Sequence, residues 1–364
     1  MDRRLEPKTI YGLKLVGLLG MGLSAVAIGY GIPAVVPPFH LEPLALGLIY
    51  VIIALGLNIV NGQAGQFSIG HAAFAGIGAY TAGGLSTMVA PRVFHWQPNT
   101  PPDLDSPGVI LFFMGSLLAG GIVAAFFGYL VGIPTLRLRG DYLAIATLGF
   151  GEIMRVTLEN TPALGGPLGL HDIPKFSTYP VIGIAVVLTI LLCRNIATSV
   201  PGRCFVALRE DEIAAESLGI ATTKVKVNAM ALSAGIAGIG GGLLAHRLGS
   251  YMPVDLNWIK SVEFVLMVVL GGSGSITGTT LAAIVLGMLP HEMLQLTKFP
   301  WLQKLIGNKM VVYSVLLIVM MLVRSLWLKG SWELSFEWMR QVGRKVRDLW
   351  TRYRGRGEGS ADGE

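Results

Sequence analysis

Charged residues are scarce in this chain. Asp, Glu, Lys and Arg make up 14% of its 364 residues, and apolar residues make up 52%. An ordinary soluble domain carries about 25% charged residues. So few charges cannot cover a surface that faces water, so most of the surface must contact lipid. The composition excludes a soluble enzyme and predicts an all-α polytopic membrane protein.

Cysteines and catalytic motifs are also few. Cys193 and Cys204 have neither the spacing of a disulfide framework nor that of a zinc site. The six histidines form no His-x-x-x-His pair, and the Gly-rich run 271–278 has no Lys, so it is not a Walker A loop. We therefore expect no catalytic residue, no metal and no cofactor in this chain.

Long hydrophobic runs are what the chain has instead. A spanning helix needs about 20 mainly apolar residues. Clear candidates are the windows 10–31, 43–60, 108–133, 180–197, 226–246 and 310–328. Windows that are shorter or interrupted by Gly are 64–88, 141–159, 261–270 and 274–290. The sequence thus predicts roughly ten transmembrane helices, with 261–270 too short to cross alone.

The cations are distributed unevenly over the predicted loops. If the N-terminus is cytoplasmic and every window crosses, Arg137, Arg139 and Arg203 lie on the cytoplasmic side together with both basic ends of the chain. This bias follows the positive-inside rule and places both termini in the cytoplasm. The net charge of +6 then reflects membrane topology, and we expect no nucleic-acid partner.

Composition divides the chain into three parts. Residues 1–330 form the predicted transmembrane domain, which includes a polar, charged and helix-patterned loop at about 198–225. Residues 331–354 combine apolar residues at helical spacing with surrounding Arg and Lys, which is typical of an amphipathic helix on anionic membrane lipids. A frayed basic tail is the alternative, and residues 355–364 are predicted to be disordered.

Two Gly-broken segments carry unusual polarity for a membrane domain. The first contains Asn61, Gln63, Gln66, Ser68 and His71, and the second, of similar texture, contains Gly271, Gly272 and Ser273. Such residues should face protein or a water-filled path rather than lipid. Broken hydrophobic segments in two parts of a transporter indicate its transport path, so these residues are path candidates.

Acidic residues inside the predicted spans need a specific reason, because a charge in a membrane is expensive. Glu152 lies three residues before Arg155, a spacing that allows an ion pair on a helix. Glu263 opens the short window 261–270. For both glutamates, a structural ion pair or helix-end role stands beside a path-lining role.

The loop at 198–225 contains a short predicted helix bounded by charge and glycine. Its acidic residues suit the positive end of a helix, its small residues allow another surface to approach, and its glycine can end the helix in a left-handed conformation. It is either a solvated connector or a docking element for a cytoplasmic partner. The candidate coupling residues are Arg209, Glu210, Asp211, Glu212, Ala214, Ala215, Glu216 and Gly219.

That loop resembles the EAA-type coupling loop of bacterial ATP-binding-cassette importers. The stretches 56–80, 136–153 and 262–276 resemble permease subunits of branched-chain amino-acid importers, notably Asn-Gly-Gln-Ala-Gly-Gln-Phe-Ser at 61–68 and Gly-Gly-Ser-Gly-Ser at 271–275. The resemblance spans roughly residues 40–330.

The resemblance implies a non-catalytic transport subunit in a bacterial inner membrane. Its partners would be a second homologous permease, two cytoplasmic ATP-binding subunits that hydrolyse ATP, and a periplasmic substrate-binding protein. The implied substrates are branched-chain or other hydrophobic amino acids. Alternatives are a urea or short-amide importer of the same class, an ion-coupled secondary transporter, and a structural membrane scaffold.

Overall fold

The computed structural model describes residues 29, 31–94, 106–135, 141–296 and 315. Over these residues the chain is all-helical, and its extended pairing is a single antiparallel bridge between Leu170 and Tyr251. The predicted spans 10–31 and 310–328 lie almost wholly outside the described residues, as do the predicted tail helix 331–354 and the end 355–364. The predicted all-α class is therefore confirmed for the described part of the chain.

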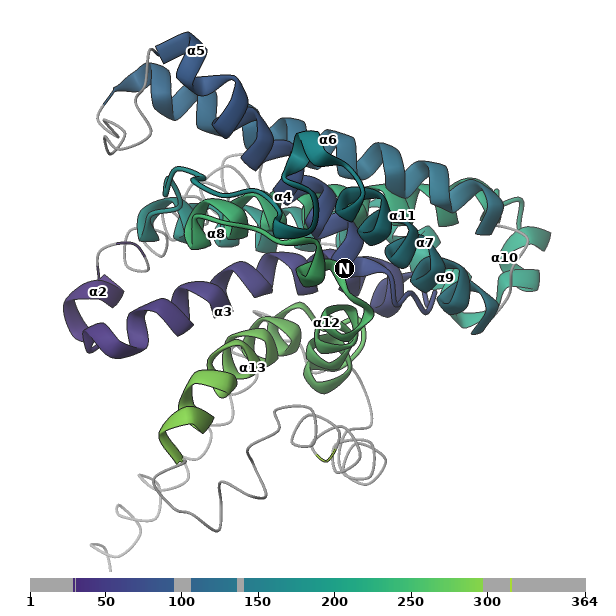
Figure 1. The fold of residues 1–364 in the computed structure, drawn as a ribbon. Helices are drawn as coiled ribbons and strands as arrows, with labels where there is room; N and C mark the ends of the chain where they lie inside the picture. The colour runs from purple at the N-terminus through teal and green to yellow at the C-terminus, as the bar shows by residue number, and fades with distance from the viewer. Residues whose placement is uncertain (1–28, 30, 95–105, 136–140, 297–314, 316–364) are drawn as a thin grey trace, which may run out of the picture.

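The helices follow one another through the bundle shown in Figure 1. In chain order they are α2 (Ile32–Val35), α3 (Pro38–Leu57), the π-helix η2 (Asn58–Gln63), α4 (His71–Met88), α5 (Ala90–Phe94), α6 (Pro107–Thr135), α7 (Asp141–Glu159), the 3-10 turns η3 (Pro162–Leu164) and η4 (Gly166–Leu168), α8 (Tyr179–Thr198), α9 (Val200–Glu210), α10 (Glu212–Ser217), α11 (Thr222–Leu248), the 3-10 turn η5 (Pro253–Leu256), α12 (Trp258–Gly271) and α13 (Ile276–Leu296).

Four described helices are long and apolar enough to cross a membrane. They are Pro38–Gln63, Pro107–Pro134, Tyr179–Thr198 and Thr222–Leu248, and Ile276–Leu289 is a shorter apolar helix. Each corresponds to a window predicted from hydrophobic runs. The windows 64–88, 141–159 and 261–270, which lie within the described residues, correspond to the helices α4, α7 and α12, but these are either more polar or too short to qualify. The chain is a multi-pass membrane protein.

The four spans differ in how deeply they are buried. In the most apolar window of each, 83% of the α3–η2 residues and 72% of the α11 residues are buried, against 39% for α6 and 33% for α8. Helices α3 and α11 are therefore the most enclosed of the four spans, while α6 and α8 carry many exposed apolar side chains. Figure 1 shows how the helices are arranged. Outward apolar faces suit lipid or another membrane subunit.

Glycine allows the central helices to approach until their backbones touch. A Cβ added to Gly78 of α4 would lie 2.1 Å from the carbonyl oxygen of Gly238 in α11, and one added to Gly241 would lie 1.8 Å from the carbonyl oxygen of Ala75. Close approach through small residues is the usual way to pack helices in lipid, where there is no hydrophobic driving force between them.

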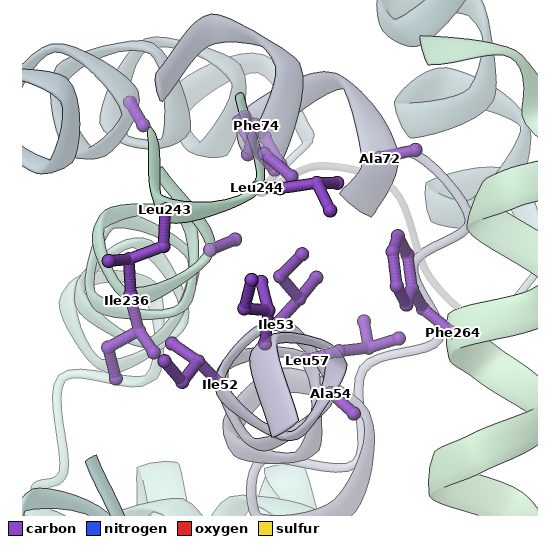
Figure 2. Close-up of a cluster of buried hydrophobic side chains, with 14 of the residues drawn as sticks. Ile52, Ile53, Ala54, Leu57, Ala72, Phe74, Ile236, Leu243, Leu244 and Phe264 are labelled. Atoms are coloured by element: carbon purple, nitrogen blue, oxygen red, sulfur yellow. The ribbon is translucent and has the colours of Figure 1, made fainter. Parts of the chain in front are cut away.

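The apolar core surrounds α3. Figure 2 shows Ile52, Ile53 and Leu57 of α3 reaching towards Leu243 of α11 and Phe264 of α12, and all five side chains are buried. Helix α3 therefore contacts α8, α11, α12 and α13 at once. A change in the conformation of α3 would therefore alter its packing against each of these helices.

One end of the bundle is fastened by a cluster that we call the Arg247 clamp, formed by Glu42, Ser177, Tyr179 and Arg247. The Arg247 guanidinium pairs with the Glu42 carboxylate, donates to the Ser177 carbonyl oxygen at 3.2 Å and to the Tyr179 hydroxyl at 2.9 Å, and lies 4.6 Å from the centre of the Tyr179 ring. The clamp joins the start of α3, the start of α8 and the end of α11.

Candidate functional site: two broken segments and a helical loop

Helix α3 does not end cleanly. It widens into the π-helix η2, and the chain then turns back through residues 64–70 before α4 begins at His71. Gly65 has a φ of +67°, which a residue with a side chain rarely adopts. The Asn61 side chain closes this turn, because its Oδ1 accepts from the Ser68 amide at 3.1 Å and its Nδ2 donates to the Ser68 carbonyl at 3.3 Å. We call residues 58–70 the first break.

The return of the chain places the start of α4 beside the interior of α3. The His71 Nε2 donates to the Ile53 carbonyl oxygen at 3.1 Å, and His71 is buried. The amide of Ala72 donates to the Ser261 hydroxyl of α12 at 3.0 Å. The starts of α4 and α12 therefore both lie beside the last turns of α3, and His71 is held by the protein itself.

The second break, residues 271–275, separates α12 from α13. Gly272 and Gly274 both have a φ of +91°. A Cβ added to Gly278 would lie 1.8 Å from the Gly271 carbonyl oxygen, so α12 and α13 contact each other through their backbones. The predicted path residue Ser273 lies at the tip of this turn and is half-buried.

The two breaks meet in the structure. The Asn58 Oδ1 accepts from the Gly274 amide at 2.8 Å, and its Nδ2 donates to the Ser275 carbonyl oxygen at 3.2 Å. A Cβ added to Gly62 would lie 2.3 Å from the Gly274 nitrogen. Segments more than 200 residues apart in the chain thus share one contact, which we call the junction. Asn58 was not among the predicted residues, since it lies inside an apolar run.

Several buried polar atoms of the first break make no hydrogen bond to the described part of the chain. They are the Gln63 Oε1, the Gln66 Nε2 and the Ser68 Oγ, each on a residue that is at most 8% exposed. A buried polar group without a partner costs about 1–3 kcal/mol. Such groups are rare in native proteins and each needs an explanation.

Helices α9 and α10 form the predicted helical loop and lie at the end of the bundle opposite α2 and α5 (Figure 1). Asp211 separates the two helices, and its Oδ1 accepts from the amides of Ile213 and Ala214 at 2.9 and 3.0 Å, which caps α10. Gly219 follows α10 with the left-handed φ of +83° expected from the sequence. The Glu212 carboxylate pairs with Lys226 at the start of α11.

Helix α10 exposes apolar side chains that its own chain does not cover. Ile213 in α10 is 68% exposed, and Leu218, which directly follows the helix, is 82% exposed. Ala214, Glu216 and Gly219 are also exposed, whereas Ala215 is only 2% exposed and packs against its own chain. Of the two small residues predicted to admit another surface, Ala214 is therefore the one that faces outward.

Arg209, the next-to-last residue of α9, connects this loop to the first break. Its Nη1 donates to the Gly62 carbonyl oxygen at 3.1 Å, and its Nη2 pairs with the Glu210 carboxylate at 2.7 Å. A Cβ added to Gly65 would lie 2.6 Å from the Arg209 Cγ, so the side chain rests directly on the backbone of the first break.

The predicted intramembrane glutamates are both paired, and the structure does not bring them to the junction. The Glu263 carboxylate pairs with Lys260 at 2.9 Å in the first turns of α12. Glu152 pairs with Arg155 at 2.8 Å, and Arg155 also pairs with Glu159 at 2.9 Å, on the partly exposed face of α7. Over the described residues, no group of three or more His, Cys, Asp or Glu side chains could hold a metal ion.

These features define a class of protein. Buried helices that break at polar, glycine-containing segments belong to membrane transporters, and a capped helix with exposed apolar residues beside the breaks is typical of a subunit that binds a partner. The chain belongs to the family described as branched-chain amino acid transport system / permease component, which matches residues 40–323.

Individual relatives agree with this assignment. The chain is 34% identical to the high-affinity branched-chain amino acid transport system permease protein LivM of Salmonella typhimurium and 35% identical to that of Escherichia coli, in each case over 81% of this chain and 72% of the relative. A probable branched-chain amino acid transport permease protein LivM of Methanocaldococcus jannaschii is 26% identical over 65% of this chain and 76% of its own length. No solved structure is a significant match.

Proposed function

We propose that this chain is one of two transmembrane subunits of an ATP-binding-cassette importer for branched-chain amino acids. The observation that carries the proposal is the position of α10, whose exposed Ile213 and Leu218 lie at the end of the bundle where Arg209 contacts the first break. An apolar surface there suits a cytoplasmic ATP-binding subunit, and the Salmonella and Escherichia relatives are named as permeases of branched-chain amino acid transport.

The proposed assembly contains a second homologous permease, two cytoplasmic ATP-binding subunits and a periplasmic substrate-binding protein in a bacterial inner membrane. Within it, residues 1–330 form a transmembrane domain of roughly ten spans with both termini cytoplasmic, and 198–225 is the coupling loop. The exposed apolar side chains of α6 and α8 support lipid or a membrane neighbour beside each of these helices. The basic segment 331–354 would lie on the inner leaflet.

The two breaks are the proposed inner part of the translocation path. The path candidates of the first break, Asn61, Gln63, Gln66 and Ser68, combine buried polar atoms with a turn that lacks regular hydrogen bonding. Irregular backbone at membrane depth is tolerated where it is enclosed by protein or lines water. Because a binding protein delivers the substrate, the permease does not need to bind it tightly in every state.

Ion-coupled transport is less well supported by the charges. Glu152 and Glu263, the two predicted intramembrane carboxylates, are both neutralised by a cation on the same helix. A coupling carboxylate must exchange an ion during each cycle, and the carboxylates of both glutamates already pair with the neighbouring Arg or Lys.

The substrate is tested with the complete transporter. The chain is co-expressed with its companion permease, ATP-binding subunits and binding protein, and the complex is reconstituted in vesicles that contain ATP. We expect ATP-dependent uptake of radiolabelled leucine, isoleucine and valine, without competition by a hundredfold excess of urea or isobutyramide. Uptake of labelled urea in place of leucine would assign the chain to the short-amide class instead, and uptake without ATP would contradict the proposal.

The docking role of α10 is tested by Leu218→Arg. The exposed position makes the substitution harmless to the chain's own fold, but a cation would be buried against the ATP-binding subunit, so we expect that subunit to be lost on purification. Leu168→Arg is the matched control, because Leu168 is 71% exposed in η4, outside the α9–α10 loop. Equal recovery of the ATP-binding subunit with both variants would show that α10 does not dock it.

A further inference from the structure

Arg209 occupies a position between the exposed helix α10 and both broken segments. Its guanidinium reaches the Gly62 carbonyl oxygen at 3.1 Å, and a Cβ added to Gly274 in the second break would lie 3.2 Å from the Arg209 Nη1. Its aliphatic stem covers Gly65. One side chain therefore contacts the backbones of two segments that are far apart in the sequence.

We propose that Arg209 is the positioning residue that transmits movement of α9 and α10 to the two breaks. The proposal rests on the proposed function, in which α10 docks an ATP-binding subunit. Since only Asp211 separates α9 from α10, a displacement of α10 moves the end of α9 and the Arg209 side chain with it. The bond to Gly62 then pulls on η2, where α3 has already lost its regular α-helical geometry.

The first break has the properties of a segment that changes conformation. It contains a π-helix, a left-handed glycine, and the buried polar atoms of Gln63, Gln66 and Ser68 that make no hydrogen bond to the described part of the chain. The absence of satisfied hydrogen bonds lowers the cost of leaving this conformation, and a second arrangement in which these groups gain partners would be favoured by comparison. A segment with two arrangements is the element that coupling requires.

Movement of the first break reaches the second through Asn58. Its side chain holds both the Gly274 amide and the Ser275 carbonyl oxygen, so η2 and the turn between α12 and α13 are joined by two hydrogen bonds. In this arrangement Arg209 transmits movement from the exposed loop to the first break, and Asn58 transmits it from the first break to the second.

The test separates coupling from assembly. In the complete transporter, Arg209→Ala should leave recovery of the ATP-binding subunit and the rate of ATP hydrolysis close to wild type. We expect leucine transported per ATP hydrolysed to fall about tenfold, which corresponds to the loss of one hydrogen bond from a charged donor. Arg203→Ala is the control, because Arg203 is an exposed cation on the same helix. An unchanged ratio, or a parallel loss of both activities, would overturn the proposal.

A covalent replacement of the contact provides a second test. In a chain with Cys193→Ala and Cys204→Ser, the pair Gly65→Cys and Arg209→Cys places two Cβ atoms about 3.0 Å apart. A disulfide needs about 3.5–4.5 Å, so the backbones must separate slightly for the bond to form. We expect this variant to be uncoupled when reduced with dithiothreitol and to recover transport per ATP when oxidised. Failure of the oxidised form to recover, with cross-linking verified by gel mobility, would contradict the proposal, and each single-cysteine variant controls for strain at Gly65.

These experiments distinguish failure of the proposed importer function from failure of the role proposed for Arg209. If the wild-type complex takes up no branched-chain amino acid, or if no ATP-binding subunit is recovered with it, the proposed function fails. If the wild type transports leucine at the expense of ATP and the Arg209 variants do so with the same ratio, only the role assigned to Arg209 fails.

Discussion

Each end of α3 and η2 is held by one arginine, and the two arrangements are very different. The Arg247 clamp near the start of α3 has an ion pair, two further hydrogen bonds and a ring contact, and the Arg247 side chain is 16% exposed. At the other end, about 30 Å away at 1.5 Å per residue, Arg209 is 37% exposed and makes one bond to the first break.

The segments that the two arginines contact also differ in regularity. The clamp fastens regular helices to one another, whereas the Arg209 contact is made to an irregular segment that contains buried polar atoms without partners in the described chain. The clamped end is therefore the more tightly held of the two, and the broken end is the less constrained. Substitutions at both ends test this contrast.

The largest effect is expected where the two breaks touch. Gly62→Leu introduces a Cβ that would lie 2.0 Å from the Asn58 Oδ1 and 2.3 Å from the Gly274 nitrogen, so the junction must separate, at about 3 kcal/mol or more. We expect leucine uptake to be abolished while the chain still inserts in the membrane. The control is Gly84→Ala in α4, where an added Cβ meets nothing within 4 Å and uptake should persist.

The clamp should matter for stability instead. Arg247→Ala removes several interactions of one partly buried cation, and we expect the free energy of unfolding to fall by about 2 kcal/mol. The readout is the midpoint of thermal unfolding in detergent, with Arg92→Ala, an exposed cation of α5, as the control. Transport per ATP should be unchanged in the surviving complex. A drop in that ratio without loss of stability would reverse the roles assigned to the two ends.

Asn58→Ala should produce an intermediate effect on both properties. The substitution removes two buried hydrogen bonds to the second break, at a cost of about 1–2 kcal/mol. We expect lower thermal stability together with lower transport per ATP. Asn58→Asp keeps an acceptor for the Gly274 amide but turns a carboxylate oxygen towards the Ser275 carbonyl, and it should be at least as damaging. Full activity in both variants would mean that the second break does not follow the first.

The smallest effect is expected on α7. Glu152 is partly exposed and belongs to a helical ion pair with Arg155, an arrangement worth about 0.3–0.5 kcal/mol. Glu152→Gln should therefore change the unfolding midpoint little and leave uptake intact. Loss of uptake by more than tenfold at normal expression would show instead that Glu152 lines the path, which is the alternative that its sequence leaves open.

The architecture was largely predictable because it depends on hydrophobic runs. The windows 43–60, 108–133, 180–197 and 226–246 correspond to α3, α6, α8 and α11, since a long apolar segment has few stable states other than a buried or spanning helix. The polar and glycine residues of both breaks were also recognisable as exceptions within such runs.

The contacts between the breaks could not be predicted. Asn58 looks like a single polar residue in an apolar helix, and nothing local indicates that its partner is Gly274. The inward orientation of Ala215 was equally hidden, because Ala214 and Ala215 are identical in type and only the rotation of α10 decides which one is exposed. Long-range pairing and helix rotation depend on tertiary packing, which a local pattern does not record.

The brevity of α12 has a consequence for the biogenesis of the chain. Its 14 residues extend about 21 Å at 1.5 Å per residue, which is less than the hydrocarbon thickness of about 30 Å. A segment of this length, followed by a glycine turn that obtains hydrogen bonds from Asn58, has no stable position among lipids alone. It needs η2 and α4 already in place, because Asn58 of η2 accepts from the Gly274 amide and the Ala72 amide of α4 donates to Ser261. The order of synthesis supplies this, because both helices emerge nearly 200 residues earlier.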